Sequence, residues 1–126
     1  MYSKNTDSEI KDLCGSLKIV NKEVIGTFYH VNLSFGDMER ISKLVDIDTL
    51  AFYLSDISGD YLKPLSRNTY LSKLGFFSCK NIDDSAIYNI AKISNLEFIS
   101  FLDTKVTDTG AKKLNELNKN LVVKFK

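Results

Sequence analysis

The chain has 126 residues, a length that suits one domain with a substantial buried core. Its 17 Lys and Arg residues against 16 Asp and Glu residues give a formal net charge of +1, so we expect neither a nucleic-acid nor a membrane partner. The sequence has no signal peptide, long apolar run or lipidation motif, and only two cysteines, so we expect a cytoplasmic protein without a disulfide scaffold.

The first 22 residues differ in pattern from the rest of the chain. Residues Ser8 to Leu13 are expected to form a short helix. Residues Leu17 to Val20 and Glu23 to Tyr29, separated by Asn21-Lys22, are expected to form a hairpin or, alternatively, to include a lone edge strand. We interpret residues 1–22 as an N-terminal cap, because repeated units need an atypical end unit to cover the exposed core.

From residue 23 onwards, one large apolar residue recurs at intervals of 24, 24, 25 and 24 residues. A constant interval of this size predicts one supersecondary unit repeated along the chain. Apolar residues alternate around each recurrence, as in Leu50 and Phe52, which predicts strands with one inward face. The recurring residues are Phe28, Phe52, Phe76, Phe101 and Phe125.

A helix is expected after each strand except the last. Each expected helix starts behind an N-cap residue whose side chain satisfies free backbone N–H groups. Pro64 is expected to interrupt a helix starting at Ser58, so that segment is expected to be shorter or to start at Pro64. Residues Leu121 to Lys126 are expected to form a final strand, whose lysines discourage edge-to-edge growth. The expected N-cap residues are Ser34, Ser58, Asp83 and Thr107.

Beyond phenylalanine, the repeats share the pattern L-x-x-L-x-L-x-x-(C/T/S), followed by an aliphatic and a short polar residue. This pattern resembles the leucine-rich repeat family, most closely its cysteine-containing and bacterial subclasses, over residues 23–126 and most strongly over 47–117. The resemblance implies an α/β fold, a leucine-rich-repeat solenoid with a parallel concave β-sheet and convex helices. It implies about four to five repeats in a single domain, 1–126, with 1–22 as the cap and 23–126 as the repeats. The clearest copy contains Leu71, Leu74, Phe76, Cys79, Ile82 and Asp83.

Catalytic chemistry finds little support in the sequence. His30 is the only histidine, so a histidine metal cluster is excluded and a Cys/His dyad would have to use it. Cys79 lies two repeats away, at an inward position typical of a buried free thiol. We interpret Asp83-Asp84 as an N-cap and a first-turn acid, not as paired catalytic carboxylates. We therefore predict no enzyme activity, no cofactor and no metal site.

The outward strand residues form columns, one residue per repeat, and these columns predict the functional surface. The middle column consists mostly of small side chains, so we expect a shallow trough that runs across the strands. The outward positions beside this trough are largely apolar. A solvated sheet face would be polar, and contiguous exposed apolar surface usually marks an interface. Self-association, cover by the N-terminal segment and a register slip exchanging Phe28 with Tyr29 remain alternatives. The expected partner-binding residues are Tyr29, His30, Tyr53, Leu54, Lys73, Phe77, Phe98, Leu102 and Asp103.

The favoured function is a non-catalytic protein-binding module. We expect an immunity or antitoxin-type inhibitor whose concave face masks one cognate protein, such as a bacterial nuclease toxin. Some bacterial immunity proteins have leucine-rich-repeat folds, so the resemblance allows this function, although the near-neutral charge argues against a basic nuclease as partner. The alternative is a leucine-rich-repeat adaptor or substrate-recognition subunit that bridges two proteins. An enzyme using Cys79 and His30 is the least favoured reading.

Overall fold

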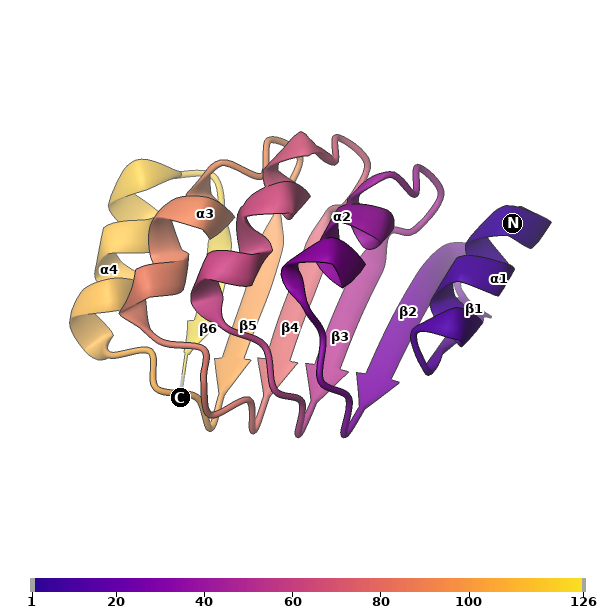
Figure 1. The fold of residues 1–126 in the computed structure, drawn as a ribbon. Helices are drawn as coiled ribbons and strands as arrows, with labels where there is room; N and C mark the ends of the chain where they lie inside the picture. Colours follow the sequence, from indigo (N-terminus) through magenta and orange to yellow (C-terminus); the bar gives the residue numbers. More distant parts are fainter. Residues whose placement is uncertain (1, 126) are drawn as a thin grey trace.

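An open six-stranded sheet runs through the computed structural model, which describes residues 2–125. The strands lie side by side in chain order, and the helices lie against one face of the sheet (Figure 1). The strands are β1 Gly15–Val20, β2 Glu23–Tyr29, β3 Thr49–Tyr53, β4 Lys73–Phe77, β5 Phe98–Leu102 and β6 Val122–Phe125. The helices are α1 Lys4–Asp12, α2 Phe35–Ser42, the 3₁₀ helix η1 Gly59–Arg67, the short 3₁₀ helix η2 Asp84–Ala86, α3 Ile87–Ala91 and α4 Asp108–Leu117.

The fold class expected from the resemblance, a leucine-rich-repeat solenoid with a parallel sheet and convex helices, is corrected by this structure. The molecule is a small α/β domain whose open sheet is mixed, because β1 runs antiparallel to β2 while β2 to β6 run parallel. Asn21 and Lys22 both have positive φ, at 51° and 70°. Such a two-residue turn reverses the chain into a hairpin, whereas a parallel neighbour would require a long crossover.

The segments that connect the parallel strands also differ from one another. Ser34 caps α2 in a reciprocal capping box with Asp37, and Thr107 caps α4 by accepting a hydrogen bond from the Gly110 N–H. Asp83 caps only the single turn η2. Three of the four expected N-caps are thus confirmed together with their side-chain bonds, and they start helices of very different length.

The fourth expected cap is confirmed in position but not in its side-chain bond, because Ser58 is the N-cap residue of η1. The expected break at Pro64 is wrong. Ser58 makes no side-chain capping bond, and η1 runs through Pro64 as a 3₁₀ helix. Its first turn is closed by the Tyr61 N–H, which donates to the Ser58 carbonyl at 2.9 Å. The tighter i→i+3 pattern of this helix accommodates a proline that would disrupt a longer α-helix.

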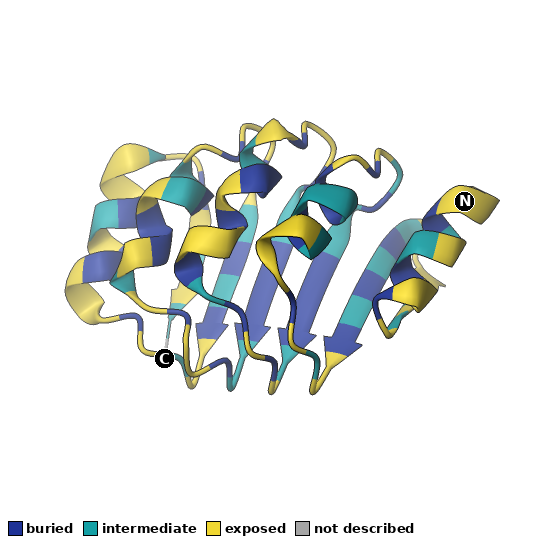
Figure 2. Cartoon of the chain, viewed as in Figure 1, coloured by how far each residue is buried: buried dark blue, intermediate teal, exposed yellow. Residues whose placement is uncertain are grey.

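The phenylalanine spacing identified the core correctly. The strand register pairs Phe28, Phe52, Phe76, Phe101 and Phe125 in one row. The first four are at most 1 % exposed, and neighbouring rings stack with centroids 5.3, 5.4 and 6.1 Å apart. Buried positions follow the strands beneath the helices (Figure 2). The alternative register, with Phe28 and Tyr29 exchanged, is therefore wrong.

The elements near the two ends of the chain differ in extent from those expected. The first helix begins earlier than expected because Ser3 accepts a hydrogen bond from the Thr6 N–H at 3.1 Å, and of the two expected arrangements for the following strands, the hairpin is confirmed. The last strand begins one residue later than expected, at Val122, and is described as far as Phe125, while Lys126 lies outside the described residues. Strand β6 is one edge of the sheet and β1 is the other.

Helix α1 packs on the same side of the sheet as the other helices (Figure 1). Ile10 of α1 is fully buried. Gly15 leaves room for this packing, since a Cβ there would lie 2.9 Å from the Ile10 Cγ2 atom and 2.5 Å from Cε1 of Phe28. Arg40 on α2 forms an ion pair with Glu9 on α1 at 2.5 Å, and this pair links the two helices. Residues 2–22 therefore do not cover the opposite face of the sheet.

Candidate protein-binding face

The face of the sheet opposite the helices is the candidate site, and we call it the helix-free face. Its side chains alternate along each strand with those of the buried row. Adjacent strands pair in register, so the predicted columns are confirmed. The columns are Ile25, Thr49, Lys73, Phe98 and Val122; Thr27, Ala51, Gly75, Ser100 and Lys124; and Tyr29, Tyr53, Phe77 and Leu102.

Three stacked aromatic rings and one leucine lie side by side on this face. We call this row the aromatic bank, and its residues are Tyr29, Tyr53, Phe77 and Leu102. The ring centroids of Tyr29 and Tyr53 lie 4.6 Å apart, and those of Tyr53 and Phe77 lie 4.7 Å apart. Tyr29 is 58 % exposed and Leu102 is 45 % exposed. Because the rings hold one another in place, the bank loses little side-chain entropy when a partner covers it.

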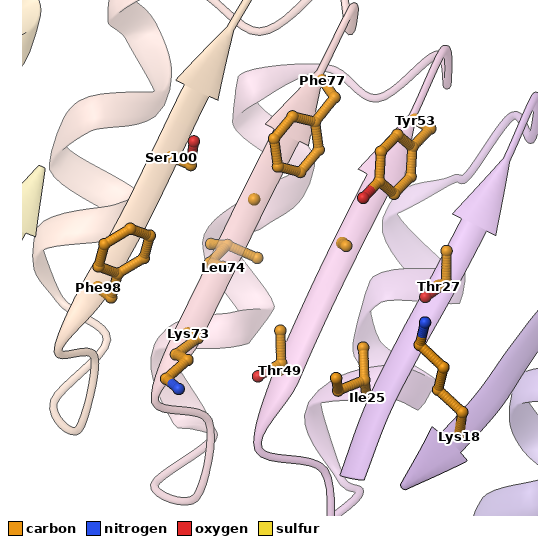
Figure 3. A pocket seen from close by; sticks show the side chains of 12 residues that line it. Lys18, Ile25, Thr27, Thr49, Tyr53, Lys73, Leu74, Phe77, Phe98 and Ser100 are labelled. Carbon is orange, nitrogen blue, oxygen red and sulfur yellow. The ribbon is translucent and has the colours of Figure 1, made fainter. Parts of the chain in front are cut away.

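Beside the bank lies a hollow of about 280 Å³ (Figure 3). Its floor contains the small residues Ala51 and Gly75, and Phe98 faces Tyr53 and Phe77 across it. The trough expected from the small middle column is therefore present. It is largely apolar and open to solvent, a shape that accepts a protruding apolar side chain.

Polar side chains also line this hollow, on the side away from the aromatic bank. Lys73 Nζ lies 2.8 Å and 2.9 Å from the two carboxylate oxygens of Glu23, and this hydrogen-bonded pair raises the pKa of Lys73. The pair joins β2 to β4 across β3. Lys18 also lines the hollow and forms no ion pair within residues 2–125. The Thr49 hydroxyl, also on the lining, is buried without a hydrogen-bond partner in the described chain.

A row of residues with positive φ forms the rim at the carboxyl ends of the strands. His30, Leu54, Ser78 and Asp103 have φ values of 51°, 52°, 56° and 57°. The backbone N–H of Leu54 donates to the carbonyl of Phe77 on the next strand at 2.8 Å, which continues the pairing beyond the strand end. This conformation costs non-glycine residues about 1–2 kcal/mol each. The sequence carries no glycine or asparagine there to signal it.

Asp103 is held in place on this rim by two neighbours. Its carboxylate accepts a hydrogen bond from the Ser78 hydroxyl at 2.9 Å and pairs with the Lys80 ammonium. These interactions, with Lys80 the larger contributor, lower the pKa of Asp103 below its ordinary value. The rim therefore keeps a carboxylate and an ammonium together next to the end of the aromatic bank.

Four of the nine predicted partner-binding residues lie around one hollow, and the other five lie outside it. Tyr53, Lys73, Phe77 and Phe98 line the same hollow. Tyr29 and Leu102 extend the bank on either side. His30, Leu54 and Asp103 lie on the rim, outside that hollow.

Lys18 and Glu23 also lie on the helix-free face, although neither is among the partner-binding residues predicted from the sequence. The hairpin alternation places both on the helix-free face, because Lys18 pairs with Ile25 and Val20 pairs with Glu23. Applying the period of two to the hairpin would have identified them from the sequence.

The groups considered for catalysis are kept apart. Cys79 is fully buried, its thiol donates to the Phe52 carbonyl at 3.3 Å, and burial raises its pKa. His30 lines a different, polar hollow together with Cys14. Among residues 2–125, no three His, Cys, Asp or Glu side chains are arranged to hold a metal ion. Over the same residues, no helix has the length and apolar character needed to cross a membrane.

No protein-family model matches this chain, and no curated protein matches it. The resemblance to leucine-rich repeats thus rests on the sequence pattern itself.

Proposed function

We propose that this protein is a non-catalytic binding module that holds one partner protein on its helix-free face. The observation that supports this most strongly is the aromatic bank, whose Tyr29, Tyr53 and Phe77 rings stack 4.6 and 4.7 Å apart on a sheet face without a covering helix. An antiparallel or mixed sheet face left to solvent is normally polar. Tyrosine and phenylalanine are favoured anchors at protein interfaces.

We further propose that binding masks the partner, as an immunity or antitoxin-type inhibitor masks a toxin. The sequence pattern that resembles leucine-rich repeats allows this role, because some bacterial immunity proteins have such repeats. A cytoplasmic location belongs to the same proposal. It is supported by the two unpaired cysteines, Cys14 at the surface and Cys79 in the core, because free thiols persist in a reducing compartment.

A bridging adaptor is the second candidate, and one feature of the helix side favours it. Phe35 on α2 and Tyr61 on η1 pack edge to face, with ring centroids 6.4 Å apart. Each residue is 38 % exposed. A protein with apolar aromatic surface on both faces has a place for a second partner.

Photo-crosslinking at two matched tyrosines tests the proposal. Tyr29 on the helix-free face is 58 % exposed, and Tyr88 on the helix side is 57 % exposed. A photoreactive phenylalanine analogue at Tyr29 should give one discrete crosslinked species in the native host, and the same analogue at Tyr88 should give none. Crosslinking at Tyr88 alone would refute the proposed face, and different partners at the two sites would favour the adaptor.

The masking role needs its own test, with the crosslinked partner expressed alone and together with this protein. Growth arrest that this protein relieves supports an inhibitor. The Phe77→Lys variant should fail to relieve it, because a charge would replace the third ring of the bank. A partner that is harmless alone would contradict the immunity role and leave the binding role in place.

A further inference from the structure

We propose that the segment held on the helix-free face is acidic as well as apolar, with carboxylates that bind Lys18 and Lys73 beside an apolar side chain in the hollow. This inference rests on the proposed function and assigns the chemistry of the partner. It follows from the charges on the face, from an ion pair already formed there and from the shape of the hollow.

The charged strand residues of the helix-free face are mostly lysines. They are Lys18, Lys73 and Lys124 against Glu23 alone. This is a formal excess of two positive charges, whereas the whole chain has a net charge of only +1. Asp48 and Glu97, which directly precede β3 and β5, also act on Lys73 through their negative charge. The unpaired positive charge of the face is therefore that of Lys18 and Lys124, which form no ion pair within residues 2–125, and it favours a partner surface of opposite sign.

The Glu23–Lys73 pair shows how a carboxylate is held on this face. Both carboxylate oxygens approach Lys73 Nζ, at 2.8 and 2.9 Å. The pair remains accessible, since the side chains of Lys73 and Glu23 are 42 % and 38 % exposed. A carboxylate of the partner reaching Lys73 would compete with Glu23 for the three N–H donors of its ammonium group. Glu23 is thus an internal competitor of the proposed ligand.

The hollow next to these lysines specifies the apolar part of the segment. Phe98 on one side and Tyr53 and Phe77 on the other enclose room for one large apolar side chain (Figure 3). Lys18 borders the same hollow, so a carboxylate next to that apolar residue would meet an ammonium group. A nucleic acid fits less well, because its affinity depends on many phosphate contacts along a basic track.

Defined peptides test this inference without knowledge of the natural partner. Four synthetic peptides would be titrated into ¹⁵N-labelled protein at low salt. They are Glu-Glu-Phe-Leu-Glu-Glu, the same Phe-Leu core flanked by Ser or by Lys, and Glu-Glu-Ser-Ser-Glu-Glu. The Glu-flanked apolar peptide should bind most tightly and should shift the amide signals of Gly75 and Ser100, and its affinity should fall with added salt.

Three variants make the test specific. Glu23→Gln should tighten binding of the acidic apolar peptide by about twofold to fivefold, because it removes the competitor for Lys73. Lys18→Glu should weaken it by about fivefold or more. Lys63→Glu makes the same charge change at an exposed position of η1 on the helix side, and it should leave the affinity unchanged.

Several outcomes would overturn the inference while leaving the proposed function to its own crosslinking test. They are equal binding of the Ser-flanked peptide, preference for the Lys-flanked peptide, tighter binding of an oligothymidylate, and absence of any binding up to about 1 mM. Weaker binding by Glu23→Gln would also contradict it, since Glu23 would then contribute to the site. Crosslinking at Tyr29 that persists despite these outcomes would show a partner of different charge.

Discussion

The ring of Phe77 lies directly over Gly75, two residues earlier on the same strand. A Cβ atom placed on Gly75 would lie 2.6 Å from Cε2 and 2.9 Å from Cζ of that ring. The absence of a side chain at position 75 therefore allows Phe77 to lean towards the middle of the sheet, where it stacks on Tyr53. One glycine thus shapes both the floor of the hollow and its aromatic wall.

Gly75→Ala should move the Phe77 ring without unfolding the protein. The clash involves the far end of a side chain that can rotate, so we expect the free energy of unfolding to change by no more than about 1 kcal/mol. The stacking on Tyr53 should be lost, visible as weaker nuclear Overhauser effects between the two rings. Binding of the acidic apolar peptide should fall with it. A variant that keeps the ring stack would show that the sheet backbone adjusts instead.

The two adjacent phenylalanines of β4 should respond in opposite ways to truncation. Phe76 is fully buried and stacks between Phe52 and Phe101, so Phe76→Ala should lower the free energy of unfolding by about 3–5 kcal/mol. Phe77 is half-buried on the helix-free face, and Phe77→Ala should cost only about 1–2 kcal/mol. Urea denaturation measures both values. The reverse order would contradict the assignment of the two faces.

Leu54 and Leu102 provide a matched pair for measuring strain on the rim. They are 51 % and 45 % exposed, but Leu54 has a φ of 52° whereas Leu102 lies in β5. Replacing Leu54 by Gly should be neutral or stabilising by up to about 1 kcal/mol, because glycine adopts positive φ without strain. Leu102→Gly should destabilise by about 1 kcal/mol. Equal losses in thermal unfolding experiments would show that the rim conformation stores no strain.

Cys79 should remain unreactive in the folded protein. A thiol reagent should rapidly label one cysteine, Cys14, which is exposed, and should label Cys79 only after unfolding. Rapid labelling of both residues in the native protein would contradict the buried position of Cys79.

The same thiol predicts a pH dependence of stability. Burial raises the pKa of Cys79 above its ordinary value of 9.0, so the unfolded chain loses this proton at lower pH than the folded chain. The contribution of Cys79 to stability is complete below pH 9 and is lost as the pH rises through the folded pKa. Urea midpoints from pH 7 to 10 should fall more steeply for the wild type than for Cys79→Ala. Equal slopes would argue against this linkage.

Local periodicity in the sequence was enough to predict strand positions, register and the inner and outer faces. The interval between phenylalanines gave Phe28 to Phe101 as the core row, and the period of two then assigned Tyr53 and Phe77 to the opposite face. A one-residue slip would have exchanged the two sets, so the repeated spacing determines both at once. The hairpin at Asn21-Lys22 was also recognisable, although the mixed sheet that it creates was not part of the expected fold class.

Side-chain positions across the sheet depended instead on long-range contacts. The Glu23–Lys73 pair joins residues 50 positions apart, the Phe77 ring leans over Gly75, and Leu54 adopts positive φ without a glycine to mark it. Each of these features arises when neighbouring strands come together, because rotamers and strained backbone angles are selected by packing and not by local preference. Residue order thus specified which side chains share the helix-free face, and assembly of the sheet gave that face its hollow and its distribution of charge.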